Sequence, residues 1–167
     1  AISDRHYLAL GSLSLTQNDP VAGRMAEHDV VIAVGTRLAF PQMFKNKVIQ
    51  IDIDKDELGR NYADTFGLAG DANRTLNEIL TIISTMDIKR PSRRGELEKL
   101  KRQRAESVKH VEPQQSLTHA IRQAVPDDGI VISGMTQIGY YSRTHFPVYK
   151  PRTYLTSSYF GNLGYAY

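Results

Sequence analysis

Apolar positions in the first half of the chain follow strand-like and helix-like patterns in alternation. The runs 30–34 and 47–53 are rich in β-branched residues, and 66–69 is a shorter apolar run. Unbroken runs of this kind are typical of parallel strands that are covered on both faces. Helix-like segments separate or follow these runs. The order predicts an α/β fold, with an open, parallel, Rossmann-like sheet in a domain over residues 1–88.

Capping residues mark two helix starts in this domain. Asp54, with Glu57 three residues on, predicts a short helix that begins with a capping box. Asp71 is placed to cap a longer helix. The apolar positions of that helix recur every three or four residues and predict one inward face: Leu76, Ile79, Leu80, Ile83 and Met86.

Residues 113–167 predict the beginning of a second α/β unit. Residues 115–125 have helical spacing, and their apolar positions are expected to face inward: Leu117, Ala120, Ile121 and Ala124. Residues 130–133 predict a buried strand that ends at Gly134, followed by a helical stretch and a further strand at 154–156. We expect this unit to be incomplete.

The last eight residues, 160–167, predict the opening of a buried helix. Gly161 and Gly164 are three residues apart, with Leu163 between them and Tyr165 after them. A natural C-terminus is usually polar and dispensable, whereas this one is apolar. We therefore expect the chain to be a piece of a longer protein, whose function is incomplete within these residues.

Composition narrows the class of protein only a little. The 167 residues fit one ordinary domain or two small ones, and the absence of cysteine excludes disulfides and thiolate metal sites within them. The longest purely apolar run is too short to span a bilayer, and no signal-like segment opens the chain. A cytoplasmic location is the expectation.

The net charge of +3 is unevenly distributed. Residues 89–110 hold nine Lys or Arg against three Glu, a charge of +6, so the remainder carries −3. This stretch has no aromatic residue to stack on a base and no nucleic-acid motif, and a Glu98–Arg102 spacing of four suits a solvated helix. We interpret residues 89–112 as a charged helical connector. Nucleic-acid binding by a basic arm is the less favoured alternative.

Two predicted strand-to-helix corners could carry chemistry. One comprises Ser133, Gly134, Met135 and Thr136, and the other lies near Gly161. In open α/β sheets, ligands bind beyond the carboxyl ends of strands, where a helix start favours an anion. A right-handed crossover would place the two corners side by side. The alternative is that each is a plain turn or packing site that needs a glycine.

Several segments together resemble a known superfamily. The segments 29–38, 48–54 and 67–72 resemble the middle domain of thiamine-diphosphate-dependent enzymes of the acetolactate synthase type. The segments 134–137 and 151–164 resemble the start of their diphosphate-binding domain. The resemblance covers nearly the whole chain and is specific for the superfamily, although no single motif is.

The resemblance implies a set of residues that bind thiamine diphosphate. Backbone groups of the first corner would meet the diphosphate: Ser133, Gly134, Met135 and Thr136. Gly161 would offer its carbonyl to the aminopyrimidine, and Leu163 would lie under the cofactor and hold it in its bent form. The parent enzyme would act on a 2-oxo acid by carboligation or decarboxylation and assemble as a homodimer or homotetramer.

The same resemblance places other functional groups outside the chain. The Gly-Asp-Gly…Asn motif that holds Mg²⁺ is expected beyond Tyr167, and the catalytic glutamate belongs to the family's N-terminal domain. We therefore expect no catalytic or metal-ligating residue here, and no activity of the chain alone. Gly134-Met135-Thr136-Gln137 stands where the family usually has Gly-Gln-His-Gln. Segment 38–41 departs from the flavin-contacting pattern, so FAD is doubtful.

A different class of function stays open on the residues alone. The chain could be a stand-alone nucleotide-binding regulatory module, with ADP or FAD at the ends of the strands at 30–34 and 48–53. The absence of a G-x-G-x-x-G loop after the first of these strands weighs against it. Asp52 and Asp54 could bind a ribose or a metal there, but capping and solvation explain both.

Overall fold

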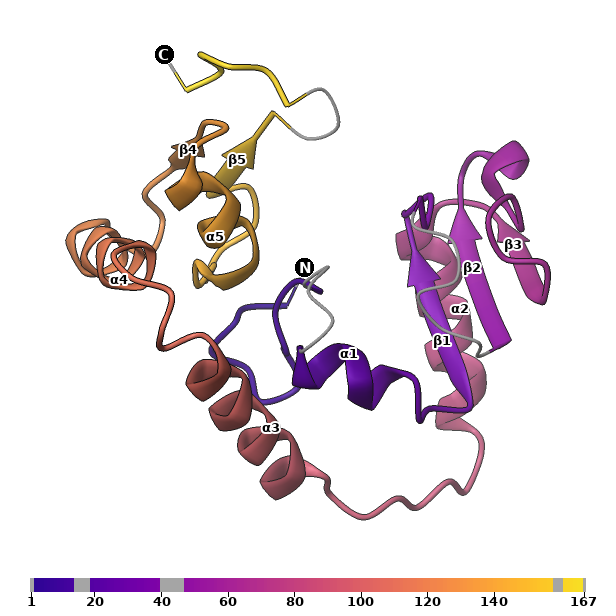
Figure 1. Ribbon diagram of the computed structural model, residues 1–167. Helices are drawn as coiled ribbons and strands as arrows, with labels where there is room; N and C mark the ends of the chain where they lie inside the picture. Colours follow the sequence, from indigo (N-terminus) through magenta and orange to yellow (C-terminus); the bar gives the residue numbers. More distant parts are fainter. Residues whose placement is uncertain (1, 14–18, 40–46, 158–160, 167) are drawn as a thin grey trace. The chain divides into compact units, whose positions relative to one another are not determined.

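The computed structural model describes residues 2–13, 19–39, 47–157 and 161–166 (Figure 1). Contacts between residues divide the chain into two compact units: residues 23–91, and residues 1–22 together with 92–167. This grouping differs from the boundaries 1–88, 89–112 and 113–167 expected from the sequence, because the first 22 residues pack with the second unit. The assignment of domains stays a prediction.

The unit of residues 23–91 contains the expected parallel sheet. Strands β1 (Val30–Val34), β2 (Lys47–Asp52) and β3 (Thr65–Ala69) are hydrogen-bonded in the order β1-β2-β3, and both pairs are parallel. Val31 lies opposite Val48, and Ile49 lies opposite Phe66. The α/β class and the open Rossmann-like sheet are therefore confirmed. Figure 1 shows helix α2 running along this sheet.

One face of this sheet forms a small core around Ala33, Val48 and Tyr62. On the same face, the Gln50 side chain is almost completely buried. Its amide nitrogen donates to the carbonyl oxygens of Thr36 (3.1 Å) and Glu57 (3.2 Å), and its oxygen accepts from the Gly59 amide (2.9 Å). This one polar residue joins the segments that follow β1 and β2.

The two predicted caps have different outcomes. Asp71 caps α2 (Ala72–Ser84), and its carboxylate accepts from the Arg74 amide at 2.9 Å, as predicted. Asp54 caps only a short 3₁₀ helix, η1 (Lys55–Glu57). The capping box was wrong, because the Glu57 carboxylate pairs with Arg60 at 2.9 Å and with Arg37 at 3.6 Å.

The apolar face of α2 is not buried, contrary to the prediction. Leu80 is 63% exposed, and Leu76, Ile83 and Met86 are exposed as well. On β1, Ile32 is 58% exposed, so its face of the sheet is only partly covered, although Ile51 on β2 is fully buried. The amphipathic pattern was read correctly as a helix. The described part of the unit supplies too few elements to cover both faces.

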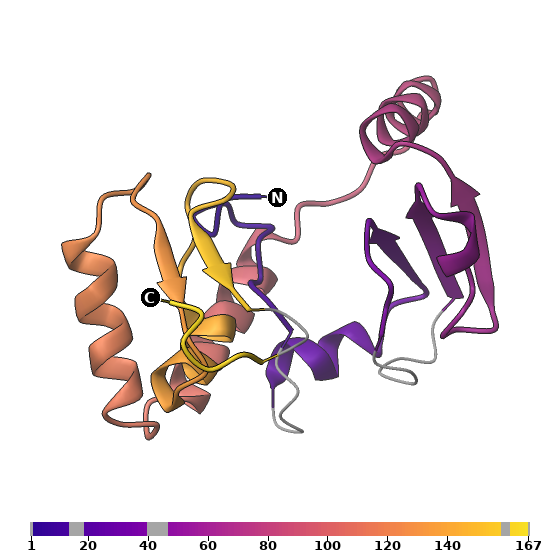
Figure 2. The same ribbon diagram turned by 90° about the horizontal axis from the view of Figure 1, so that it is seen from above.

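The second unit contains a two-stranded parallel sheet and several helices. Helix α1 (Pro20–Met25) spans the division between the units. Helices α3 (Arg94–Ser107), α4 (Gln114–Ala124) and α5 (Gln137–His145) follow, with α4 packed on α5. Strands β4 (Val131–Ser133) and β5 (Tyr154–Thr156) pair in parallel (Figure 2).

The faces of this unit also differ from the prediction. Leu117 and Ile121 on α4 are exposed, so the apolar face of this helix is not buried as expected. Ile130, just before β4, is 63% exposed, so the start of the predicted buried strand is not buried either. Thr118 and Arg122 are buried instead. The Arg122 guanidinium is buried because it donates to three carbonyl oxygens, those of Val125, Pro126 and Pro147.

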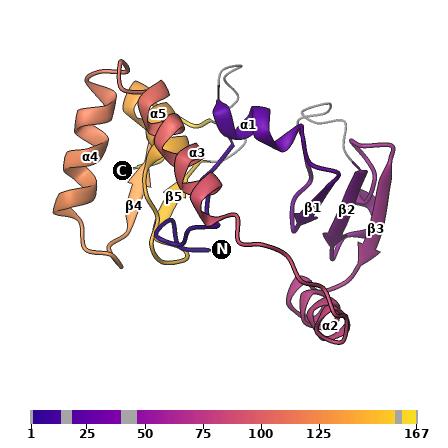
Figure 3. The same cartoon turned by 90° about the horizontal axis from the view of Figure 1, so that it is seen from below.

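Helix α3 confirms that the charged stretch is helical, but it is more than a solvated connector. Its Leu100 and Arg104 are buried, and Arg104 donates to the carbonyl oxygens of Leu10 and Ser12. Glu98 pairs with Arg94 at 3.0 Å rather than with Arg102. Figure 3 shows α3 as the element between the linker after α2 and the rest of this unit. None of the helices in the described ranges could span a lipid bilayer.

Candidate functional site

The two corners predicted from the sequence lie side by side. Strands β4 and β5 are parallel, with Ser133 opposite Thr156, so the chain leaves both strands at the same edge of the sheet. A Cβ atom added at Gly161 would lie 3.3 Å from the Met135 Cε atom. One added at Gly134 would lie 3.7 Å from the Ala166 Cβ atom. The adjacency expected from a right-handed crossover is thus confirmed.

The first corner ends β4 and begins α5. Ser133 is buried at the end of the strand, and Thr136 has an extended backbone and caps the helix. The Thr136 hydroxyl accepts from the Gly139 amide at 3.1 Å. An N-terminal helix turn carries free amides and a partial positive charge, both of which favour an anion. The corner therefore has the polarity that a diphosphate requires.

Gly139, which the sequence analysis did not single out, shapes this corner. A Cβ atom there would lie 2.1 Å from the Gly134 carbonyl oxygen and 3.0 Å from the Ser133 Oγ atom. Only a residue without a side chain allows the first turn of α5 to lie this close to the end of β4. Its place inside a predicted helix, where glycine is unfavourable, was the sequence feature that could have indicated this packing role.

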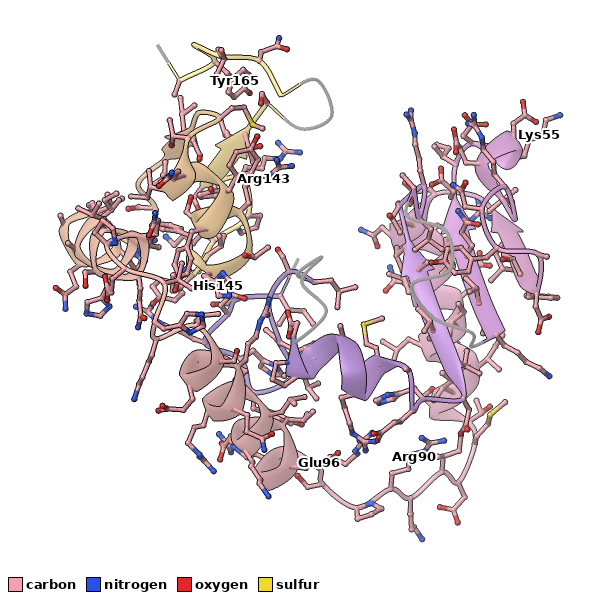
Figure 4. All side chains as sticks on the ribbon, in the orientation of Figure 1. Lys55, Arg90, Glu96, Arg143, His145 and Tyr165 are labelled. Carbon is pink, nitrogen blue, oxygen red and sulfur yellow. The ribbon has the colours of Figure 1, made fainter. Side chains whose placement is uncertain are left out.

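The second corner follows β5 and contains two glycines with positive φ. Gly161 has a φ of 56° and Gly164 has a φ of 77°, and residues 163–166 form a turn. The predicted opening of a buried helix is therefore wrong, because the left-handed backbone at Gly164 interrupts a helical path. Leu163 is 85% exposed, and Tyr165 is exposed as well (Figure 4). Residues 158–160, between β5 and Gly161, lie outside the described residues.

A buried hydroxyl lies between the strand and the second corner. The Ser157 Oγ atom is buried and has no hydrogen-bond partner among the described residues. An unsatisfied buried hydroxyl costs about 1–3 kcal/mol, so the position favours a ligand that bonds to it. The corners thus offer a ligand three kinds of group: the amides at the start of α5, the Ser157 hydroxyl and the exposed Leu163 side chain.

The described residues offer no metal site. Within them, no group of three His, Asp or Glu side chains is placed to hold an ion. A divalent cation at the corners would need ligands from elsewhere.

Comparison with known proteins supports the resemblance seen in the sequence. Residues 1–79 match the family described as "Thiamine pyrophosphate enzyme, central domain". A probable 2-ketoarginine decarboxylase from Pseudomonas aeruginosa is 30% identical over 151 residues, which cover 84% of this chain and 26% of the relative. The pyruvate oxidase of Lactiplantibacillus plantarum is 26% identical over 174 residues, covering 98% of this chain and 29% of the relative.

A third relative extends the comparison to synthases. A probable acetolactate synthase large subunit from Methanococcus aeolicus is 25% identical over 193 residues, covering 99% of this chain and 32% of the relative. The chain therefore spans about a quarter to a third of the length of these curated relatives. The family match to a central domain agrees with the parallel sheet of residues 23–91. The chain belongs to the acetolactate synthase-like superfamily of thiamine-diphosphate-dependent enzymes.

Proposed function

We propose that this chain is part of an enzyme that binds thiamine diphosphate and forms or cleaves a carbon–carbon bond next to the carbonyl of a 2-oxo acid. The names of two relatives contain such an acid, 2-ketoarginine and pyruvate. The observation that carries the proposal is the adjacency of the corners after β4 and β5. When bound, the cofactor supplies a carbon nucleophile that the side chains of proteins lack.

The two corners would bind different parts of the cofactor. Backbone groups of Ser133, Gly134, Met135 and Thr136 would hold the diphosphate at the start of α5. The Gly161 carbonyl would accept from the aminopyrimidine, and Leu163 would support the cofactor from below in its bent form. Leu163 is free for this contact because the described chain leaves it exposed.

We propose further that the parent enzyme holds Mg²⁺ through residues beyond this chain. We also propose that it is a cytoplasmic homodimer or homotetramer. The 167 residues alone would be inactive and bind the cofactor weakly. A larger parent enzyme is supported by the length of the relatives, of which the chain spans only a quarter to a third.

The test is a titration of the isotope-labelled chain with thiamine diphosphate, followed residue by residue by NMR. We expect weak binding, with a dissociation constant of about 1 mM or higher, and shifts at 133–136 and 161–164. Thiamine without the diphosphate is the matched control and should shift the first corner less. Shifts confined to other segments, or tight binding that depends on Mg²⁺, would contradict the proposal.

The same titration separates the alternative function. A stand-alone nucleotide module would respond to ADP or FAD at the segments after β1 and β2, at residues 35–38 and 53–54. No response there, together with a response at the corners to thiamine diphosphate, would favour the enzyme.

A further inference from the structure

A groove of about 740 Å³ lies in the unit formed by residues 1–22 and 92–167. Its walls are the N-terminal segment 2–12, one side of α3, the end of α5 and the loop after α5. All of its lining residues belong to this unit, and none belongs to the two corners. Sites for small molecules in proteins typically have volumes of roughly 300–1,000 Å³, so the groove is large enough for one.

Hydrogen bonds hold the walls of this groove together. The Asp4 amide donates to the Val148 carbonyl at 3.0 Å, and the Val148 amide donates to the Asp4 carboxylate at 2.7 Å. On the other side, the Lys101 ammonium donates to the His6 carbonyl at 2.7 Å. The N-terminal segment is therefore fixed both to α3 and to the loop after α5, and the groove is part of the fold.

Cationic side chains outnumber carboxylates in the lining of the groove. Asp4 is its only carboxylate, against four cationic side chains: Arg5, Lys101, Arg104 and Arg143. Arg5 is paired with Asp127, and Arg104 is paired with Asp19. Lys101 and Arg143 have no carboxylate partner among the residues that the structure describes. A cleft lined by one sign of charge concentrates the opposite sign, so this groove attracts anions.

The groove also offers apolar surface and a free donor. The partly exposed Val148 and the buried Phe146 line it, and Arg143 lies near the end of α5, three residues before Phe146 on the chain. The Arg104 Nε atom is buried, and among the described residues it has no hydrogen-bond partner. Figure 4 shows Arg143 and His145 on α5, both of which line the groove.

We propose that this groove binds a small organic anion, whose carboxylate or phosphate group pairs with Arg143 and whose apolar part contacts Phe146 and Val148. Lys101, whose ammonium has no carboxylate partner among the described residues, adds positive potential that attracts the anion, whereas the charges of Arg5 and Arg104 are offset by Asp127 and Asp19. The binding is separate from the thiamine diphosphate corners and does not depend on them.

The test uses phenyl phosphate and benzoate as probes, with phenol as the neutral control of matched shape. We expect at least one of the anions to shift NMR signals at 2–12 and 142–149, and to bind at least about tenfold more tightly than phenol. A response to phenyl phosphate alone identifies a phosphate ligand, and a response to benzoate alone identifies a carboxylate. Equal binding of phenol, shifts elsewhere or no binding would overturn the proposal.

A pair of variants tests the role of Arg143. Arg143→Gln should weaken binding of the better anion at least about fivefold. Arg102→Gln, which removes an exposed arginine of α3 outside the groove, should bind it as the unaltered chain does. As a measurement that needs no variant, raising the salt from about 50 to about 500 mM should weaken the binding. Binding that is insensitive both to Arg143→Gln and to salt would overturn the proposal.

Discussion

The guanidinium of Arg104 on α3 and the carboxylate of Asp19 form a buried ion pair, with 3.1 Å between the Arg104 Nη2 and Asp19 Oδ2 atoms. The same guanidinium bonds to the carbonyl oxygens of Leu10 and Ser12. Arg104 therefore ties residues that are more than 80 positions away in the sequence to the charged helix.

Replacing Arg104 should destabilise the unit that it holds together. In Arg104→Met, the buried Asp19 carboxylate loses its ion pair with Arg104, and breaking a buried pair in this way costs about 3–5 kcal/mol. Urea unfolding measures the loss in the free energy of unfolding. Arg102→Met, which changes an exposed arginine two residues away, is the matched control and should change stability by less than about 0.5 kcal/mol. Equal effects of the two variants would contradict a special role for Arg104.

Gln50 should be equally difficult to replace in the other unit. Gln50→Leu keeps the size of the side chain but leaves the Thr36 and Glu57 carbonyls and the Gly59 amide without their partner. Each buried unsatisfied group costs about 1–3 kcal/mol, so we expect a loss of at least about 2 kcal/mol in chemical unfolding. Gln103→Leu on the exposed side of α3 is the control. A stable Gln50→Leu variant would show that the amide is not needed there.

Removing the cap of α2 should lower the stability by a smaller amount. Asp71→Ala removes the acceptor of the Arg74 amide and should cost about 1 kcal/mol. Asp71→Asn keeps a capping oxygen and should cost less, which separates the hydrogen bond from the loss of charge. Circular dichroism during thermal unfolding measures both variants.

Gly161 should affect the cofactor site more than the fold. Its φ of 56° strains any other residue, so Gly161→Ala should cost about 1 kcal/mol and weaken the NMR response to thiamine diphosphate. Gly23→Ala is the control, because Gly23 lies in α1 and a Cβ atom added there would have no other atom within 4 Å. If the response to the cofactor survives in Gly161→Ala at full strength, Gly161 has no part in binding.

Stability should fall in mild acid because of His145. Burial holds the pKa of His145 below its ordinary value, and the charge of Arg104 acts in the same direction. The unfolded chain takes up this proton near pH 6.5, while the folded chain resists it until a lower pH. Stability is therefore lost as the pH falls below about 6.5. Thermal unfolding between about pH 7.5 and 5.5 should show this slope, and His145→Gln should reduce it; an unchanged slope would contradict the assignment.

The sequence alone was enough to predict local secondary structure. The β-branched runs predicted β1 and β2 within one residue, and Asp71 predicted the start of α2, because strand propensity and capping depend on near neighbours. The adjacency of the corners after β4 and β5 also followed, since crossovers between parallel strands have one preferred hand. The order and spacing of several segments also identified the superfamily correctly.

The tertiary structure alone decided which faces are buried and which polar groups carry the packing. The apolar stripes of α2 and α4 predicted helices correctly but burial wrongly, because burial depends on what other elements cover a face. Gln50, Arg104 and the unsatisfied Ser157 hydroxyl gave no local signal, since their hydrogen-bond partners, or the lack of them, depend on distant segments. Secondary structure is determined mainly by interactions a few residues apart, whereas burial and polar satisfaction are determined by the whole chain.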